Sequence, residues 1–374
     1  MRIACVASSR VPSTTANSIQ VMKVCQSLVQ VGGEVKLWVP GKTHTPWVDL
    51  AKLYGLSSSF DIDWLPDRPA YRRYDLAMAS MGYIKKWKAD LLYTWLPQAA
   101  WLGLIAGMAV ILEVHDRPTG RLGPWLLRQT AASKGVKRLA IITRALFKVL
   151  QTEFRVQIRD ENVVIAPNGV ELERYTNLSP APQARSQLNL PEMPTAVYSG
   201  HFYEGRGMEL LFGLAGAFPQ VQFLWVGGRQ AAVDEWRAII ASKGLNNIFL
   251  TGFIHNSDLP LYQASGDFLL MPYERAIAGS GGGNSADICS PMKMFEYLAC
   301  GRVILASDLP VFHEVLSPQN AVFCPPDNVE GWKTTLSDLL NNPQRGQSLA
   351  AQASLDAQAY SWRSRAEKTL QGFL

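Results

Sequence analysis

The residue that most invites a chemical role is Lys293, which lies near the start of a predicted helix over 290–301 (SPMKMFEYLACG). The helix dipole disfavours a cation in the first turn. A bound phosphate would remove that penalty, because an ammonium group and free helix N–H groups can hold it together. Glu296 follows on the same face and could accept a hydrogen bond from a sugar hydroxyl. The pair predicts a clamp for a nucleoside diphosphate; an ordinary helix with a solvated Lys–Glu pair is the alternative.

The sequence predicts both ends of this helix. Ser290 is expected to cap the N-terminus, Pro291 suits the first helical position, and Gly301 is the expected stop. Apolar residues at helical spacing are expected to face a core; they are Met292, Phe295 and Ala299.

A second cation, Arg206, ends the loop 199–207 (SGHFYEGRG) just before another predicted helix. A guanidinium there is an anion site by the same reasoning, so Arg206 and Lys293 could meet one diphosphate; a surface arginine is the alternative. The glycine-rich stretch 279–290 precedes the Lys293 helix. Its glycines (Gly281, Gly282 and Gly283) would let the backbone approach a ligand or move as a lid, unless the loop is merely disordered.

In the first half of the chain, the strand ending in EVHD (113–116) should present His115 and Asp116 at its carboxyl edge. His115 could orient a hydroxyl or act as a general base there. The first strand–helix turn (8–20) is rich in Ser and Thr, and Asn17 is expected to cap the helix or to face a sugar. This turn lacks GxGxxG and the chain lacks GxxxxGK[ST], which argues against a nicotinamide or flavin enzyme and against a P-loop NTPase.

Short apolar strands alternate with helices along nearly the whole chain, which predicts an α/β protein with doubly wound parallel sheets. The segment 176–194, rich in Pro, Ser and Asn, is interpreted as a linker. We therefore expect two Rossmann-like domains, 1–175 and 190–360, with a final helix over 361–374. Ligands of such sheets bind beyond the carboxyl ends of the strands, here in the cleft between the domains.

Charge is unevenly divided between the halves. Residues 1–175 carry 23 Lys and Arg against 14 Asp and Glu, a balance of +9, whereas residues 176–374 have a balance of −4. Basic residues surround Trp87 and Trp125, a pattern suited to an anionic membrane surface, to a phosphorylated acceptor, or simply to water. No nucleic-acid motif accompanies the charge, so nucleic acid is not expected.

The remaining composition places few constraints on partners. No apolar run reaches the roughly 18 residues of a membrane span, and the N-terminus has no secretory pattern. The five scattered cysteines indicate neither disulfides nor zinc. A cytoplasmic location is expected, with peripheral contact on the inner face of the membrane as an extension of the charge pattern.

Taken together, these stretches resemble the GT-B-fold retaining glycosyltransferases of family 4 (glycosyltransferase group 1), in the subgroup with an SPxKxFEY helix. Besides EVHD, the loop 199–207 and the 290–301 helix, APNGVE (166–171) is similar to the family's turn at the end of domain 1. FLTGFIHNSDLPLYQASGDFLLMPY (249–273) resembles a further family segment, and the tail resembles a last helix that returns to domain 1.

The resemblance implies a role for each matched residue. Arg206, with Lys293, would bind the donor diphosphate, Glu296 the ribose, and His115 the transferred sugar or the acceptor. The other residues of the donor side would be Gly200, His201, Phe253, Ile254 and Ser290. Of these, Phe253 and Ile254 would lie near the base, and Ser290 would lie at the start of the 290–301 helix. Asn17 and Asp116 would lie on the acceptor side. The family's first glutamate is replaced by Ile288, with Asp287 next to it.

The implied reaction is sugar transfer from a UDP-, GDP- or ADP-sugar to an acceptor hydroxyl with retention, in cell-surface glycan or glycolipid synthesis. The acceptor would be lipid-linked, a polysaccharide or a small metabolite. Neither a metal nor another cofactor is expected, since DID (61–63) lies in the wrong domain for a metal motif. A nucleotide-sugar 2-epimerase of the same fold and a non-catalytic nucleotide-sugar-binding subunit stay open as alternatives.

Overall fold

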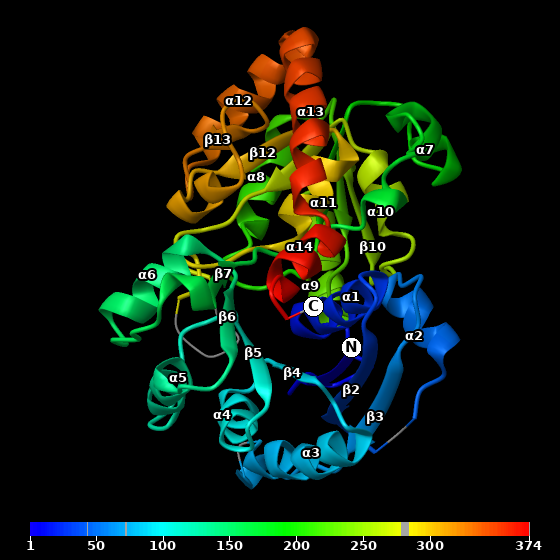
Figure 1. The fold of residues 1–374 in the computed structure, drawn as a ribbon. Helices are drawn as coiled ribbons and strands as arrows, with labels where there is room; N and C mark the ends of the chain where they lie inside the picture. The colour runs from blue at the N-terminus through cyan, green and yellow to red at the C-terminus, as the bar shows by residue number, and fades with distance from the viewer. Residues whose placement is uncertain (43, 72, 278–283, 374) are drawn as a thin grey trace. The chain divides into compact units, whose positions relative to one another are not determined.

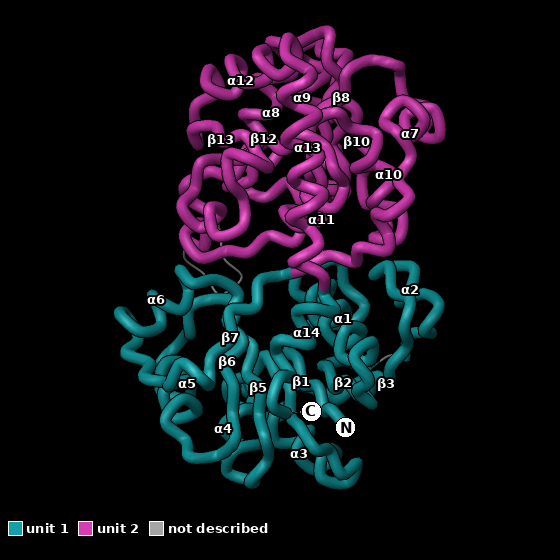
Figure 2. The backbone as a smooth tube through the Cα atoms, turned by 45° about the horizontal axis from the view of Figure 1, so that its top comes forward, with its two compact units in different colours: residues 1–168, 362–374 teal, residues 169–361 magenta. Residues whose placement is uncertain are grey.

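A computed structural model describes residues 1–42, 44–71, 73–277 and 284–373. The chain divides into two compact units, coloured separately in Figure 2. Unit 1 comprises residues 1–168 and 362–374, and unit 2 comprises residues 169–361. Each unit is described by itself. The predicted glycine-rich stretch with Gly281, Gly282 and Gly283 lies outside the described residues.

Unit 1 is built on a seven-stranded sheet of order β3-β2-β1-β4-β5-β6-β7, and every pairing is parallel. Its inner strands are mostly apolar and almost completely buried, as expected for a parallel sheet covered by helices on both faces. The strands are β1 (Arg2–Val6), β2 (Glu34–Pro40), β3 (Asp61–Leu65), β4 (Leu91–Thr94), β5 (Ala109–Val114), β6 (Lys137–Ile141) and β7 (Val163–Ile165).

Helices connect consecutive strands of this sheet, so that β1, at the reversal of strand order, lies between β2 and β4. Such a reversal is where open α/β sheets bind ligands. The helices are α1 (Ala16–Gln30), α2 (Trp47–Tyr54), α3 (Tyr74–Trp87), α4 (Pro97–Ile105), α5 (Gly123–Ala132), α6 (Arg144–Thr152) and the C-terminal α14 (Trp362–Leu370).

Unit 2 repeats the architecture with a six-stranded parallel sheet of order β10-β9-β8-β11-β12-β13. The strands are β8 (Thr195–Ser199), β9 (Gln222–Val226), β10 (Ile248–Gly252), β11 (Phe268–Met271), β12 (Val303–Ser307) and β13 (Val322–Cys324). The helices are α7 (Ala181–Gln187), α8 (Met208–Ala217), α9 (Gln230–Ser242), α10 (Leu259–Ala264), α11 (Met292–Cys300), α12 (Val329–Asn341) and α13 (Pro343–Ala357). The expected pair of doubly wound Rossmann-like domains is confirmed.

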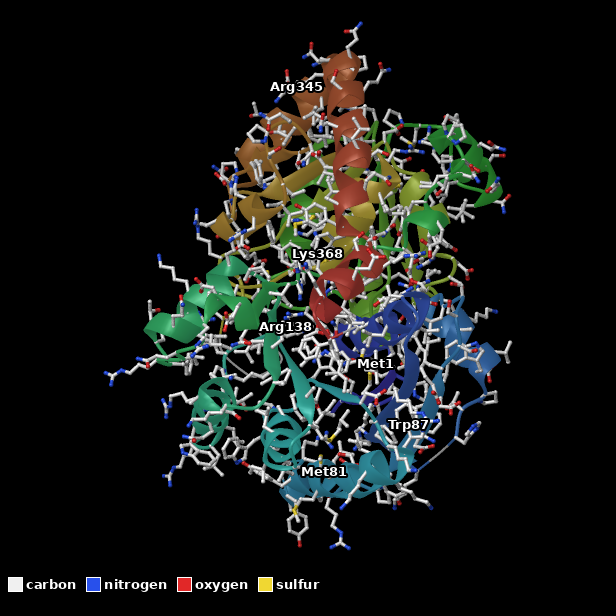
Figure 3. All side chains as sticks on the ribbon, viewed as in Figure 1. Met1, Met81, Trp87, Arg138, Arg345 and Lys368 are labelled. Atoms are coloured by element: carbon white, nitrogen blue, oxygen red, sulfur yellow. The ribbon has the colours of Figure 1, made fainter. Side chains whose placement is uncertain are left out.

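The last helix returns to the first unit. α14 lies against α1 (Figure 1) and buries Trp362 and Leu370. Arg138 of β6 donates to the backbone oxygens of Thr369 and Gln371, both at 2.7 Å, and Figure 3 shows it beside this helix. These contacts fasten a helix that arrives from residues more than two hundred positions away in the sequence.

One local expectation is wrong. Residues 176–194 are not a plain linker, because they contain α7, whose Arg185 is buried and bonded to Asp267 at 3.0 Å. Helix α5 lies in the segment after β5, for which no helix was predicted. Trp87, which lies among the basic residues Lys85, Lys86 and Lys88, packs against Trp38 with ring centroids 5.8 Å apart.

Among the described residues, none of the helices combines the length and the apolar character that a membrane crossing requires.

Candidate functional site

The loop that carries Arg206 is held against the segment after β11 by two glycines. Gly205 and Gly207 both have positive φ angles, of 81° and 69°. A Cβ atom would lie 2.3 Å from the Ala276 oxygen at Gly205 and 1.9 Å from the Pro272 oxygen at Gly207. Only glycine allows both the backbone angle and this approach. The packing places Arg206 directly before α8, whose N-cap is Gly207.

Lys293 lies in the first turn of α11, and its nitrogen is buried. Its Nζ has no hydrogen-bond partner within the part of the chain that the structure describes. The ammonium instead lies 3.8 Å from the ring centroid of Tyr198 and 5.4 Å from that of Tyr273. Burial, and then the nearby Arg206 charge, hold the pKa of Lys293 well below its usual value, although Glu296 opposes this. An anion placed here would supply the missing partner.

Arg206 and Lys293 contact the same aromatic ring. The Arg206 guanidinium carbon lies 4.7 Å from the ring centroid of Tyr273, so that one tyrosine contacts both cations. Gly200 completes the group, because a Cβ atom there would lie 2.9 Å from Lys293 Nζ. Three predicted donor residues, which come from the end of β8, the start of α8 and the start of α11, therefore meet around one spot.

Glu296 is held in place one turn further along α11. Gln263 of α10 donates to Glu296 Oε2 at 3.0 Å and to Ser199 Oγ at 3.2 Å. The other end of the same amide accepts from the Tyr175 hydroxyl at 2.8 Å. Gln263 is fully buried, so this bond orients the Glu296 carboxylate, and Glu296 itself is partly exposed.

The remaining predicted donor-side residues follow other strands or pack on other side chains. Phe253 and Ile254 follow β10, an edge strand two positions from β8, and the Phe253 side chain is 46% exposed. His201 stacks on Tyr203 with ring centroids 4.8 Å apart, and its backbone oxygen accepts from the Tyr198 hydroxyl at 2.7 Å. Phe253 packs edge-on against His255, with ring centroids 5.5 Å apart.

The start of α11 differs from expectation. Pro291 is the N-cap residue and the helix begins at Met292, with no side chain capping it, so Ser290 is not the cap. Ser290 is buried just before the helix. Met292 is only partly buried, while Phe295 and Ala299 do face the core. Gly301 ends the helix at φ 61°, as expected. At the position of the family's first glutamate, Ile288 is buried, and the neighbouring Asp287 is exposed.

Unit 1 contains a separate cluster at the end of β5. His115 follows the strand as predicted, and its Nε2 lies 2.5 Å from Glu113 Oε1. Glu113 itself is buried in the strand, where it also accepts from Gln20, Tyr93 and Arg365. Burial raises the pKa of Glu113, but Arg365 and His115 outweigh this and lower it to about 2. The carboxylate is therefore ionised at any working pH.

The two predicted acceptor-side residues, Asp116 and Asn17, are both at least partly exposed. Asp116 accepts from the Arg117 backbone N–H at 2.8 Å and is partly exposed. Asn17 is exposed in the first turn of α1 and is not its cap, because Thr15 accepts from the Ser18 N–H. The Thr15 side chain lies before the helix, where a hydroxyl reaches the free N–H groups.

Sequence reasoning missed Glu113 and Arg365, although a signal existed. A glutamate inside a buried apolar strand needs a cation partner. Glu113 and His115 are two residues apart, so their side chains share a face of the strand. The partner arginine could not be identified from the sequence, because it lies 252 residues away. Tyr198 and Tyr273, which flank the donor cations, were missed because tyrosines in apolar strands look like core residues.

This chain is similar in sequence to known proteins. Residues 194–342 match the family model described as glycosyl transferases group 1. The chain is 26% identical over 359 residues to a phosphatidyl-myo-inositol mannosyltransferase of Mycolicibacterium smegmatis, covering 91% of this chain and 85% of that protein.

Solved structures share the fold at low identity. A sucrose-phosphate synthase from Thermosynechococcus elongatus matches with a TM-score of 0.75 and 17% identity, covering 100% of this chain and 98% of that one. HepE of Anabaena in complex with UDP-glucose matches with a TM-score of 0.72 and 17% identity, covering 100% of this chain and 99% of that one. The two Rossmann-like domains are those of the GT-B fold. The sequence match therefore supports a glycosyltransferase, with residues 194–342 matching the glycosyl transferases group 1 model.

Proposed function

We propose that the protein transfers a sugar from a nucleoside diphosphate sugar to an acceptor hydroxyl, with retention of configuration and without a metal ion. The observation that carries this proposal is the buried Lys293 nitrogen, which has no hydrogen-bond partner among the described residues and lies beside Arg206. Burial and the nearby Arg206 charge disfavour the protonated form of Lys293, and a bound anion would favour it. A diphosphate at the start of a helix is such an anion.

The protein binds the donor through its diphosphate and its ribose. Lys293 and Arg206 take the charge that a metal ion would otherwise balance, and Glu296 accepts from a ribose hydroxyl. The exposed Phe253 ring, with Ile254, offers an apolar surface to the base. The solved HepE complex contains UDP-glucose, which supports a donor of this chemical class; UDP-, GDP- and ADP-sugars are the candidates.

The proposed step needs no enzyme carboxylate as nucleophile. The acceptor oxygen forms a bond to the anomeric carbon on the face from which the diphosphate oxygen departs, which retains the configuration. The bond from the anomeric carbon to that diphosphate oxygen breaks, and the departing oxygen takes the acceptor proton. Charge therefore grows on the diphosphate, where Arg206 and Lys293 stabilise it. His115 contacts the transferred sugar or the acceptor.

The test is a donor screen followed by a transfer assay. Thermal shift measurements with UDP-, GDP- and ADP-sugars identify the donor, and radiolabelled donor is then offered to membrane lipid extracts and to oligosaccharides, with and without a chelator. We expect acceptor-dependent transfer that survives the chelator. Conversion of the donor without acceptor would indicate an epimerase. Donor binding with no transfer to any acceptor would indicate a binding subunit, and loss of transfer with the chelator would overturn metal independence.

Binding of the nucleoside diphosphate should weaken as pH rises, because Lys293 loses its proton at a pKa well below the usual one. Above that pKa the anion binds only with uptake of a proton, so affinity falls by at most about tenfold per pH unit. The same shift makes the free protein more stable as pH rises, since the unfolded chain then binds more protons. Calorimetric titration at several pH values measures the affinity.

Lys293→Arg is the matched control for this pH dependence. Arginine keeps its charge throughout the range, so binding to the variant should vary little with pH. An equally steep decline in Lys293→Arg would assign the titration to another group.

We further propose that the acceptor is lipid-linked and that unit 1 meets it at an anionic membrane. The Mycolicibacterium smegmatis relative is named for a phosphatidyl-myo-inositol acceptor, which supports this class. Residues 117–159 contain ten Lys and Arg and one acidic residue, Glu153. Helix α5 lies in this segment. Exposed apolar and basic side chains combine just before it, at Arg121 and Leu122, and within it at helical spacing, at Trp125, Arg128 and Ala132. That combination suits an interface of anionic lipid headgroups.

Trp125→Ala should weaken binding to phosphatidylglycerol-containing vesicles roughly tenfold, because the indole is the largest apolar group of these exposed side chains and inserts among headgroups. Trp125 is 42% exposed and rests edge-on against Trp101. Vesicle sedimentation measures the loss. Leu355→Ala, which removes a 67% exposed side chain from unit 2, should change nothing. Equal binding of the wild type to vesicles of pure phosphatidylcholine would contradict the electrostatic part of the proposal.

A further inference from the structure

The cluster around Glu113 in unit 1 has no part in the proposed step so far, yet it contacts His115 directly. We infer that Glu113, paired with Arg365 of the C-terminal helix, is a positioning group that fixes the ring orientation and the tautomer of His115. The inference rests on the proposed function for its consequence in turnover, but its geometry stands apart from that function.

Every donor around the Glu113 carboxylate is fixed by a different element. Oε1 accepts from Arg365 Nη2 at 2.6 Å, from His115 Nε2 at 2.5 Å and from Gln20 of α1. Oε2 accepts from the Tyr93 hydroxyl of β4. The Glu113 side chain is 0% exposed. A carboxylate that is buried and surrounded by four donors cannot turn, so neither can a ring bonded to it.

The carboxylate also determines which histidine nitrogen carries a proton. An ionised carboxylate only accepts hydrogen bonds, and the pKa of Glu113 is lowered to about 2. Nε2 of His115 must therefore be the N–H donor. In the neutral ring Nδ1 then has the free lone pair. The His115 side chain is 23% exposed, so this nitrogen can accept a hydrogen bond from a hydroxyl of the acceptor or of the transferred sugar.

Arg365 makes this arrangement possible by balancing the buried charge. Its side chain is 5% exposed, and besides Glu113 it donates to the Pro167 oxygen at 2.8 Å and the Ala166 oxygen at 3.1 Å. With Arg365 in place, the carboxylate does not depend on a protonated His115 for a counter-charge. The C-terminal helix thus contributes to a site at the end of β5 without touching a substrate.

Histidine-selective 15N NMR tests the inference on the whole chain without any substrate. The protein has five histidines, and His115→Gln assigns the resonance. We expect a downfield, slowly exchanging Nε2 proton on His115, because a proton held by a buried carboxylate is protected from water. In Glu113→Gln it should move upfield and exchange faster with water, because a neutral amide oxygen is a weaker acceptor than a carboxylate. Absence of this proton in the wild type, or its persistence unchanged in Glu113→Gln, would overturn the inference.

Turnover supplies the second readout. Glu113→Gln should lower kcat about a hundredfold, the cost of misplacing a group that positions a reacting hydroxyl, while the donor Kd stays unchanged because the donor cations lie in unit 2. Since this variant leaves the Arg365 charge buried, Glu113→Gln/Arg365→Met is made beside it to keep the cluster neutral. Wild-type kcat in the double variant would show that the pair serves folding alone.

Arg138→Met is the matched control for helix docking. It removes two hydrogen bonds that fasten α14 but leaves Glu113 and His115 untouched. We expect the protected Nε2 proton and the kcat to persist. Loss of both in Arg138→Met would assign the effect to docking of the helix and overturn the positioning role. A protein that transfers no sugar at all would still show the His115 proton, so failure of the proposed function is separable.

Discussion

Lys293→Met is expected to lower kcat/KM for sugar transfer about 10²- to 10³-fold, the usual cost of removing one preorganised donor from developing charge. The same substitution should stabilise the free protein by about 1–3 kcal/mol, because it removes a buried nitrogen that has no hydrogen-bond partner in the described structure. Opposite signs of the two effects distinguish a binding group from a structural one. Initial rates with the identified donor and urea unfolding of the free protein measure them.

The control for this substitution is Lys333→Met in the same unit. Lys333 pairs with the exposed Glu330 at 2.7 Å on the surface of α12, and such pairs contribute little. Both its transfer rate and its unfolding free energy should match the wild type. If Lys293→Met destabilised the free protein and left donor affinity unchanged, Lys293 would be a structural residue and the diphosphate site would have to lie elsewhere.

Arg365→Met is expected to destabilise the protein by about 3–5 kcal/mol, the cost of leaving one buried charge without its partner. The pair is closed at 2.6 Å, and both side chains are almost fully buried. The substitution also removes the hydrogen bonds to the backbone oxygens of Ala166 and Pro167. Thermal unfolding should therefore begin at a clearly lower temperature, and calorimetry would detect it as an earlier transition.

The double variant Glu113→Gln/Arg365→Met separates charge burial from helix packing. With both charges gone, most of the lost stability should return. Its acid unfolding should also change. The pKa of Glu113 is lowered from 4.5 to about 2, so its stabilisation is present above pH 4.5 and disappears as pH falls towards 2. The double variant should lack that part of the decline; no recovery of stability at neutral pH would mean that side-chain packing of Arg365 dominates.

The sequence was sufficient for the repeating architecture, because its signal is local. Apolar runs of five residues such as β1 and β12, each fully or nearly buried, are recognisable without knowing what they pack against. The same holds for the stop at Gly301, which requires a positive φ that glycine adopts easily. Local patterns failed where tertiary packing overrode them. The predictions of Ser290 as the cap of α11, of Asn17 as the cap of α1 and of a linker in place of α7 are wrong.

For the candidate site, the sequence alone identified Lys293 and Arg206. Both lie at the start of a predicted helix, where a positive charge is unexpected. The sequence also supplied His115, because a strand end is visible in the pattern. Their surroundings were decided only by the tertiary structure. Tyr273 lies between the two cations because β11 is the neighbour of β8, and the sequence of one strand does not state its neighbour.

The same physical reason applies to the Glu113 cluster. Its members come from α1, β4, β5 and α14, and their pairing depends on where the C-terminal helix docks. Hydrophobic periodicity predicted that this helix exists but not that Arg365 points inward to a buried carboxylate. Composition and spacing thus determined which groups could do chemistry. Long-range packing determined which of them are buried, which lose their partners, and so which are poised to act.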